Sequence, residues 1–252
     1  MSLPDEYFRT LLTELTRGLP RQGPGSSEAT LRALTMVGQL PRKPRILDVG
    51  CGAGAQTIDL ARATGGDIIA LDISDALLGE VEERAEAAGV AHQITTLRQS
   101  MFEMNFDADQ FDLIWSEGAI YVMGFGEGLR RCYRFLKPGG SMVVSELSWL
   151  SDNPPREARE YWATNYPQMQ SIDANVRVAS QAGFVEARTF ILPVADWWMN
   201  YYGPAEARMH EVRRRHAEDP KAISILDEIA REYDLFRKYS EVYGYVFYIT
   251  RK

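Results

Sequence analysis

The chain has 252 residues, of which 45% are hydrophobic and 25% are charged, a composition typical of a globular enzyme with a sizeable core. The formal net charge of −7 argues against a nucleic-acid partner, because such partners require a basic surface. No apolar run approaches the roughly 18 residues that span a membrane, and two cysteines give no disulfide framework. We therefore expect a cytoplasmic protein without a membrane partner.

Two helices are predicted in the N-terminal segment, residues 1–44. Apolar residues recur at helical spacing over 5–19, and a second helix is expected to begin at Ser26 or Ser27 and to run to about residue 40. The stretch between them is rich in proline and glycine, which predicts an irregular connection.

From residue 45 onward, short apolar runs alternate with helical segments. The runs lie at 45–49, 67–72, 93–98, 111–116 and 141–147, and the helices between them lie at 55–64, 75–88 and 126–136. This alternation predicts parallel strands joined by right-handed helical crossovers, which form a doubly wound, Rossmann-like α/β sheet. Lys137-Pro138-Gly139-Gly140 is expected to end the third of these helices in a turn before the fifth strand.

The second half of the chain has longer helices, expected at 154–166, 172–182, 204–217 and 219–241, and strands at 184–192 and 243–250. An insertion, residues 193–241, therefore separates the last two of seven strands. We expect a core made of 45–192 and 242–252, with the insertion and the N-terminal helices as a cap over its site.

A glycine-rich turn follows the first strand, in Asp48-Val49-Gly50-Cys51-Gly52-Ala53-Gly54. Glycine has no Cβ, so backbone at such a turn can contact a ligand directly. Asp72 ends the second strand, at the same edge of a parallel sheet, where a carboxylate can accept hydrogen bonds from both ribose hydroxyls of an adenosine. The turn and this acid together predict a cofactor that contains adenosine.

Two classes of cofactor share this geometry. Gly50-x-Gly52-x-x-Ala55 satisfies a dinucleotide pattern, so an NAD(P)-dependent oxidoreductase is one alternative. Asp48 favours S-adenosylmethionine instead, because a carboxylate repels a pyrophosphate and stabilises the ammonium of an amino acid. A non-catalytic protein that binds S-adenosylmethionine remains a second alternative.

Several segments lie in the order and at the spacing of the motifs of one known family. These are Ile46–Gly54, Asp72, Phe111–Ser116 and Leu136–Ser141. Through them, residues 45–147 resemble the core of class I S-adenosylmethionine-dependent methyltransferases. Arg21–Ser26 and Trp115–Tyr121 further resemble a bacterial group of small-molecule methyltransferases that is similar to the ubiquinone and menaquinone biosynthesis methyltransferases.

This resemblance implies S-adenosylmethionine as the cofactor and a sheet whose last strand is antiparallel. It also implies that Asp48 holds the methionine ammonium, that Gly50, Gly52 and Gly54 allow close approach, and that Asp72 binds the ribose. Further expected cofactor contacts are Ile73, Ser100, Met101 and Ser116. The chain departs from the family at Gln99-Ser100-Met101, where an acid often contacts the adenine amine. The Ser100 hydroxyl or the Met101 backbone would take that role here.

Two acids at strand carboxyl ends, Glu117 and Glu146, are candidate general bases. The sulfonium donor is already activated, so a base is needed mainly where the acceptor must lose a proton. Alternatively, Glu117 is a cofactor-positioning or capping acid, and Glu146 supports other side chains or anchors a loop. No His, Cys or Asp pair has zinc-ligand spacing, so no metal is expected.

Aromatic residues are concentrated in the expected cap, and Tyr121, Trp149 and Trp198 are the candidates to line the acceptor pocket. Such a pocket favours a planar or apolar acceptor and excludes water. An aromatic cap also makes a homodimer conceivable. The sequence therefore predicts a methyltransferase that acts on a small aromatic or apolar metabolite, and it does not identify the atom that is methylated.

Overall fold

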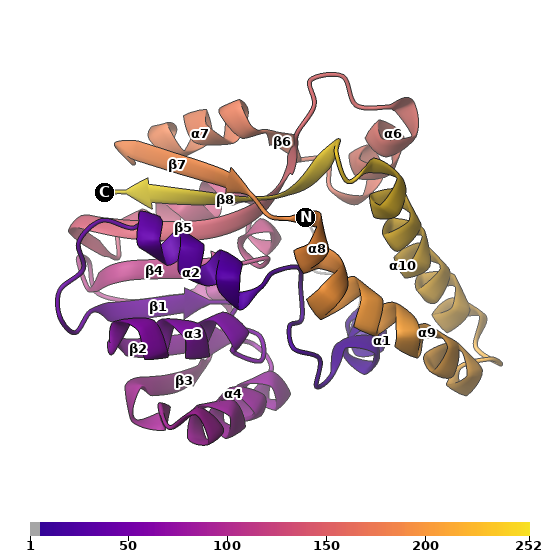
Figure 1. The fold of residues 1–252 in the computed structure, drawn as a ribbon, viewed down its shortest axis with the longest axis horizontal. Coiled ribbons are helices and arrows are strands. Elements are labelled where there is room, and N and C mark those ends of the chain that lie inside the picture. Colours follow the sequence, from indigo (N-terminus) through magenta and orange to yellow (C-terminus); the bar gives the residue numbers. More distant parts are fainter. Residues whose placement is uncertain (1–5) are drawn as a thin grey trace.

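The structure, a computed structural model, describes residues 6–252. It contains a central sheet with helices on both faces and a group of helices beyond the carboxyl ends of its parallel strands (Figure 1). The strands are β1 (Arg45–Val49), β2 (Asp67–Asp72), β3 (Ile94–Arg98), β4 (Phe111–Glu117), β5 (Leu136–Trp149), β6 (Gln170–Ser171), β7 (Glu186–Ile191) and β8 (Tyr243–Arg251). Residue 5, where the first helix was expected to begin, and the rest of 1–5 lie outside the described residues.

The main strand order is β3-β2-β1-β4-β5-β8-β7. β1 to β5 pair in parallel, whereas β8 runs antiparallel to both β5 and β7. The Rossmann-like sheet with an antiparallel last strand is therefore confirmed. The count of seven strands needs a correction, because the two-residue β6 adds an eighth strand, paired with β5 beside the main path.

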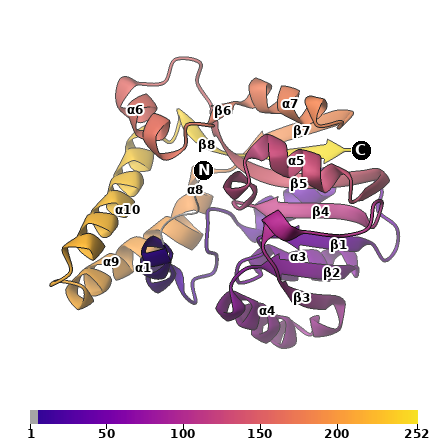
Figure 2. The ribbon, with the colours of Figure 1, turned by 180° about the vertical axis from the view of Figure 1, so that it is seen from behind.

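Some of the α-helices cover the two faces of this sheet, and others form a separate group beside it. The α-helices are α1 (Glu6–Thr16), α2 (Ser27–Met36), α3 (Ala55–Thr64), α4 (Asp75–Ala88), α5 (Phe125–Tyr133), α6 (Arg156–Asn165), α7 (Ile172–Gln181), α8 (Val194–Trp197), α9 (Gly203–Arg215) and α10 (Pro220–Tyr239). α2 and α3 lie in front of the sheet in Figure 1, and α5 lies on the opposite face, which Figure 2 shows. Short helical turns η1 (Ala91–Gln93), η2 (Met101–Glu103) and η3 (Ile120–Val122) follow other elements.

Local capping explains why the helices after β1 and β2 have the expected bounds. The Ser74 hydroxyl accepts the Leu77 N–H at the start of α4, and α3 and α4 end at Gly65 and Gly89, both in the left-handed conformation that favours glycine. The expected turn before β5 is wrong, because residues 136–140 already belong to that strand. Gly139, with φ +76°, allows an irregularity there, where the register with β4 shifts.

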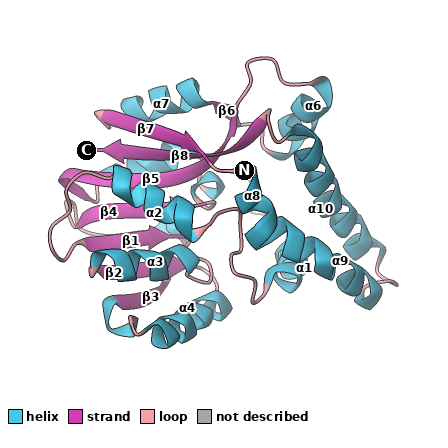
Figure 3. Cartoon of the chain, in the orientation of Figure 1, coloured by secondary structure: helices cyan, strands magenta, loops and turns pink. Residues whose placement is uncertain are grey.

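The cap is made of α1, α8, α9 and α10, on the side toward which β1 and β4 point in Figures 1 and 3. α1 packs against α9 and α10, whereas α2 packs on α3 over the sheet. Only the first N-terminal helix therefore joins the cap, which corrects the expectation for the second. A π-helical turn, η4 (Trp198–Tyr202), connects α8 to α9 and places several aromatic residues side by side.

The core consists of two main apolar clusters, one on each face of the sheet. One cluster is continuous from Trp115 and Leu147 of the sheet to Trp197, Tyr202 and Phe236 of the cap, all buried. The other lies under α5 and α7, around Phe111, Leu129 and Ala179. Burial of these side chains fixes the cap on the sheet. None of the helices within residues 6–252 is long and apolar enough to cross a membrane.

Candidate cofactor and acceptor sites

The glycine turn after β1 has a backbone that other residues cannot adopt without strain. Gly50, Gly52 and Gly54 have φ values of +70°, +55° and +78°. A Cβ on Gly50 would lie 2.5 Å from the Cβ of Ala119, and one on Gly54 would lie 2.9 Å from Val81. The N–H groups of Gly50 and Cys51 donate to the Leu71 carbonyl, at 2.8 and 3.0 Å, which fastens the turn to β2.

Asp48 lies fully buried beneath this turn. The Thr57 hydroxyl donates to its carboxylate at 2.6 Å, and the Gln56 amide donates to both oxygens at 3.1 and 3.3 Å. Burial raises the pKa of Asp48 to about 7, although the bonds from Thr57 and Gln56 oppose that shift. Sequence reasoning missed both partners, whose position in the first turn of the following helix was the available signal. Contact between Asp48 and an ammonium stays a prediction.

Asp72 connects the end of β2 to the turn. One of its oxygens accepts the Gly52 N–H at 3.0 Å, and the other accepts the Ser74 N–H at 3.0 Å. The residue is half-buried, and the neighbouring Ile73 is 52% exposed. A carboxylate accepts more than one hydrogen bond per oxygen, so Asp72 has capacity left for a ligand hydroxyl.

The remaining predicted cofactor residues divide into two groups. Ser100 caps η2 by accepting the Phe102 N–H at 3.3 Å, and the Met101 methyl group lies 3.5 Å from where a Cβ of Gly50 would be. The Ser116 hydroxyl instead donates to the Val49 carbonyl at 2.9 Å and is fully buried, so it joins β4 to β1. Phe102 follows Met101 in η2 and is 41% exposed. This apolar side chain was not among the predicted cofactor residues.

Glu117 is surrounded by donors. Arg21 and Thr30 donate to its two oxygens at 2.7 Å each, and the Trp115 indole N–H donates at 2.8 Å. The side chains of Arg21 and Glu117 are 7% and 4% exposed, so the ion pair is buried. Arg21 also lies 3.5 Å from Asp59. Nothing in the sequence connected Glu117 with Thr30 or Asp59, although Arg21 opens a segment that resembled a family motif.

The segment from residue 17 to residue 26 runs between the glycine turn and the cap. The Gln22 side-chain oxygen accepts the Ala53 N–H at 3.0 Å. Farther along, the Ser26 hydroxyl donates to Asp196 at 2.7 Å, and the Asn200 amide donates to the Gly25 carbonyl at 2.9 Å. This segment, here termed the strap, therefore links the turn after β1 to α8 and η4.

Glu146 of β5 has a different environment. It is 2% exposed, and one carboxyl oxygen accepts the Tyr166 hydroxyl at 2.5 Å. Its other oxygen, Oε2, is buried without a hydrogen-bond partner among the described residues. Burial raises the pKa of Glu146 to about 8, and the bond from Tyr166 only partly opposes this shift.

Of the three aromatic candidates for the acceptor pocket, Tyr121 lies near Glu146. The Tyr121 ring lies 6.0 Å from that of Tyr166, and burial, followed by the charges of Glu232 and Glu146, raises its pKa. Trp149 packs against Tyr243, with ring centroids 6.2 Å apart. Trp198 lies beneath the Arg237 guanidinium, 4.5 Å from it.

Two further aromatic side chains, Tyr166 and Tyr245, also lie near Glu146. The Tyr245 hydroxyl lies 3.5 Å from where a Cβ of Gly118 would be, directly after β4, and its ring lies 4.9 Å from that of Trp197. Burial raises the pKa of Tyr245, as do Tyr121 and Glu146. Tyr166 and Tyr245 belong to the aromatic residues visible in the sequence, but only the fold selects them from that set.

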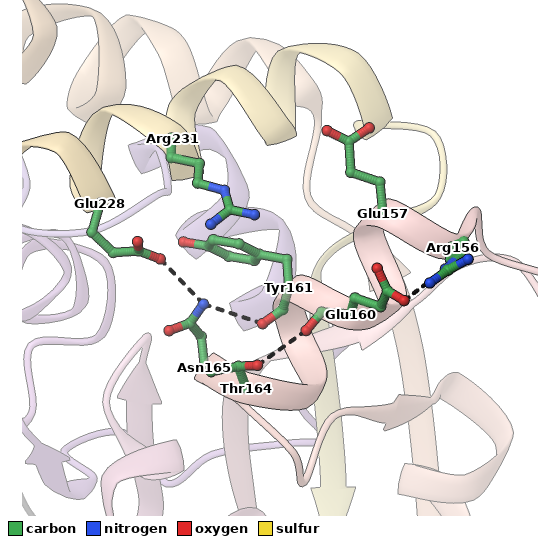
Figure 4. Close-up of a pocket in the computed structure, with 8 residues that line it drawn as sticks. All are labelled: Arg156, Glu157, Glu160, Tyr161, Thr164, Asn165, Glu228 and Arg231. Atoms are coloured by element: carbon green, nitrogen blue, oxygen red, sulfur yellow. Dashed lines mark hydrogen bonds and ion pairs between the residues drawn. The ribbon is translucent and has the colours of Figure 1, made fainter.

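A cavity of about 710 Å³ lies elsewhere, between α6 and α10 (Figure 4). Its walls carry Arg156, Glu157, Glu160, Thr164, Asn165 and Glu228, with Arg231 over the Tyr161 ring. None of the predicted site residues lines this cavity. Within residues 6–252, no group of three His, Cys, Asp or Glu side chains is arranged to hold a metal ion.

Comparison with known proteins agrees with this geometry. Residues 46–140 match a family described as "Methyltransferase domain". A ubiquinone/menaquinone biosynthesis C-methyltransferase of Roseobacter denitrificans is 30% identical over 168 residues, 60% of this chain and 64% of that protein. A sterol 24-C-methyltransferase of Kluyveromyces lactis is 29% identical over 149 residues, 55% of this chain and 40% of that protein. The chain thus spans less than two thirds of these relatives.

The fold is shared over nearly the whole chain with a solved S-adenosylmethionine-dependent methyltransferase from Geobacter sulfurreducens. That structure, in complex with S-adenosyl-L-homocysteine, superposes with a TM-score of 0.80 at 20% identity and covers 96% of this chain and 97% of its own. The motif order, the matched family and the shared fold lead to one assignment. Residues 46–140 are a methyltransferase domain, and together with the similarity to the C-methyltransferases and the shared fold this supports a class I S-adenosylmethionine-dependent methyltransferase, with S-adenosylmethionine as the cofactor.

Proposed function

We propose that this protein transfers a methyl group from S-adenosylmethionine to a small acceptor with aromatic or apolar character. The observation that carries the proposal is the bond between Asp72 and the Gly52 N–H, which joins the ends of β1 and β2 around a turn of three left-handed glycines. Such a turn admits a ligand close to the backbone, and an acid beside it suits a ribose.

The roles on the donor side follow from the positions of the residues. The turn and Asp48 would surround the methionine part, Asp72 would bind the ribose, and Ile73, Ser100 and Met101 would lie against the adenine. Ser116 contributes by fixing β4 to β1. S-adenosylmethionine supplies an activated methyl group on a sulfonium. The chain therefore has to bind the donor and the acceptor, orient them for transfer and exclude water.

On the acceptor side, Glu146 and Tyr121 are the residues that we propose to contact the acceptor. Glu146 has an oxygen without a hydrogen-bond partner and a raised pKa, and both suit a carboxylate that acts as a general base. Glu117 fits a positioning role better, since three donors already occupy its oxygens. Trp149 packs against Tyr243, and Trp198 packs against Tyr202 and Phe236. Both tryptophans would form the outer wall of the acceptor pocket.

Calorimetric titration separates this function from an NAD(P)-dependent oxidoreductase. We expect S-adenosylmethionine and S-adenosylhomocysteine to bind and NAD and NADP not to bind. Tight NAD binding without S-adenosylmethionine binding would overturn the proposal.

Incubation with a methyl-labelled donor and a metabolite extract, followed by mass spectrometry, then tests for transfer. Donor binding without any labelled product would favour a non-catalytic binding protein. The proposal includes a cytoplasmic location and allows a homodimer, whose mass light scattering would measure.

A further inference from the structure

The surroundings of Glu146 restrict the chemistry of the acceptor. Oε2 of Glu146 is buried and unpartnered, and a buried carboxyl without a second partner is unfavourable unless a ligand supplies one. The side chains that interact with this carboxyl are phenols. Tyr166 donates to Oε1, and Tyr121 and Tyr245 lie close enough for the charge of Glu146 to raise their pKa values.

A second carboxyl adds to the negative character of this region. Glu232 of α10 accepts the Tyr202 hydroxyl at 2.6 Å, and burial raises its pKa. Its charge acts on Tyr121, Tyr201 and Tyr245. Glu146 on β5 and Glu232 on α10 therefore both lie near Tyr121 and Tyr245.

No basic side chain of the described residues neutralises these two acids, since none of their ion pairs includes Glu146 or Glu232. The nearby Arg237 covers Trp198 and pairs with Glu206 and Asp234. Arg231 covers Tyr161. A carboxylate or phosphate acceptor would therefore meet two acids and no cation.

We infer that the acceptor carries a basic amine, which binds with its nitrogen at Oε2 of Glu146 among the rings of Tyr121 and Tyr245. An ammonium supplies both the missing donor and the missing positive charge, and it is attracted to the faces of aromatic rings. This inference rests on the proposed function, because it assigns the acceptor of that reaction.

In the chemical step, Glu146 accepts the proton that the acceptor must lose. The ammonium gives one proton to the Glu146 carboxylate, which becomes a carboxylic acid, and the amine nitrogen gains a free electron pair. That pair forms the new nitrogen–carbon bond to the methyl group, while the carbon–sulfur bond breaks and leaves its electrons on sulfur. The products are a methylated ammonium and S-adenosylhomocysteine.

Three probes of similar size test the inference: 2-phenylethylamine, 2-phenylethanol and 3-phenylpropanoate. Each is titrated calorimetrically at pH 8.5 into protein saturated with S-adenosylhomocysteine. We expect the amine to bind at least about tenfold more tightly than the other two. Glu146→Gln should weaken amine binding by about tenfold and leave S-adenosylhomocysteine binding and alcohol binding unchanged. Glu160→Gln, in an exposed acid of α6, is the matched control and should change neither.

Preferred binding of the alcohol or the carboxylate would overturn the inference, as would no binding of any probe to the protein with S-adenosylhomocysteine bound. Failure to bind S-adenosylhomocysteine would instead contradict the proposed function. Should Glu146→Gln not fold, Tyr166→Phe gives a second test. The Tyr166 hydroxyl lowers the pKa of Glu146, so its loss should move the onset of amine binding to higher pH. An unchanged onset would count against the inference.

Discussion

The donor side and the acceptor side of the molecule differ in how their polar groups are satisfied. Around the glycine turn, Asp48, Asp72 and Glu117 each have partners from the chain on both carboxyl oxygens. Around Glu146, one oxygen has a partner and the other has none. The donor side is thus preorganised by the protein, whereas the acceptor side lacks groups that a ligand can supply.

The largest effect should come from breaking the buried ion pair of the donor side. Arg21→Met leaves Glu117 charged and buried, and we expect a loss of about 4 kcal/mol in unfolding free energy, or roughly 8–16 °C in Tm. Calorimetry or circular dichroism measures this. Arg156→Met, which breaks an exposed pair with Glu160, is the control and should leave Tm nearly unchanged. Equal Tm values for the two variants would show that the donor side is not preorganised in this way.

The next effect tests the glycine turn. Gly50→Ala adds strain at a positive φ and forces its Cβ against Ala119, so donor affinity should fall by roughly 100-fold, about 3 kcal/mol. Gly65→Ala is the matched control, because Gly65 has φ +62° and open space around it. That variant should lose stability and keep donor affinity. Unchanged affinity in Gly50→Ala would place the donor elsewhere.

A pH series sharpens the comparison on the acceptor side. With a pKa of about 8, Glu146 is mostly protonated at pH 7 and mostly ionised at pH 9, so kcat/KM should rise about tenfold between them. Since this pKa is raised above that of the unfolded chain, the stability from Glu146 is lost as pH rises through about 8. Infrared spectra should show a protonated carboxyl band that fades over the same range.

That band should be missing from Glu146→Gln. Asp48 and Glu232 are also buried acids with raised pKa values, so the difference between the wild-type and Glu146→Gln spectra is the relevant readout. A difference spectrum without pH dependence between 6 and 10 would contradict the assignment.

The smallest effect concerns Asp72. Asp72→Asn keeps one acceptor oxygen where the structure uses two, for Gly52 and Ser74. We expect donor affinity to fall by roughly fivefold, about 1 kcal/mol. Asp75→Asn, which loses only an exposed pair with Arg98, should bind the donor as the wild type does. Equal affinities in titrations would remove Asp72 from the donor site.

The sequence predicts well what local chemistry determines. Ser74, Gly65 and Gly89 cap α3 and α4 through neighbours in the chain, so the bounds of these helices were predictable. The alternation of strands and helices likewise predicted the sheet. Contacts between distant segments were not predictable. The pairing of Glu117 with Arg21 and Thr30 requires α2 to lie on the sheet face rather than in the cap, and no periodicity encodes that choice.

The acceptor side shows the same division. Glu146 and the aromatic residues could be named as candidates, but which rings reach Glu146 depends on η3, which carries Tyr121, and on the pairing of β5 with β8, which carries Tyr245. The sequence predicted a helix that begins at residue 204, whereas the helical chain starts at Val194 and includes a π-helical turn before α9. That turn sets the positions of Trp198 through Tyr202.

The position of α1 has a consequence for the order in which the molecule is built. α1 packs on α9 and α10, and Arg208 of α9 donates to the Leu15 and Arg17 carbonyls at the far end of the chain. During synthesis, the segment that carries the glycine turn is complete well before α9 and α10 exist. The apolar face of α1 therefore stays exposed until the last third of the chain has been synthesised. The contacts of α1 with α9 and α10 are thus late steps of folding.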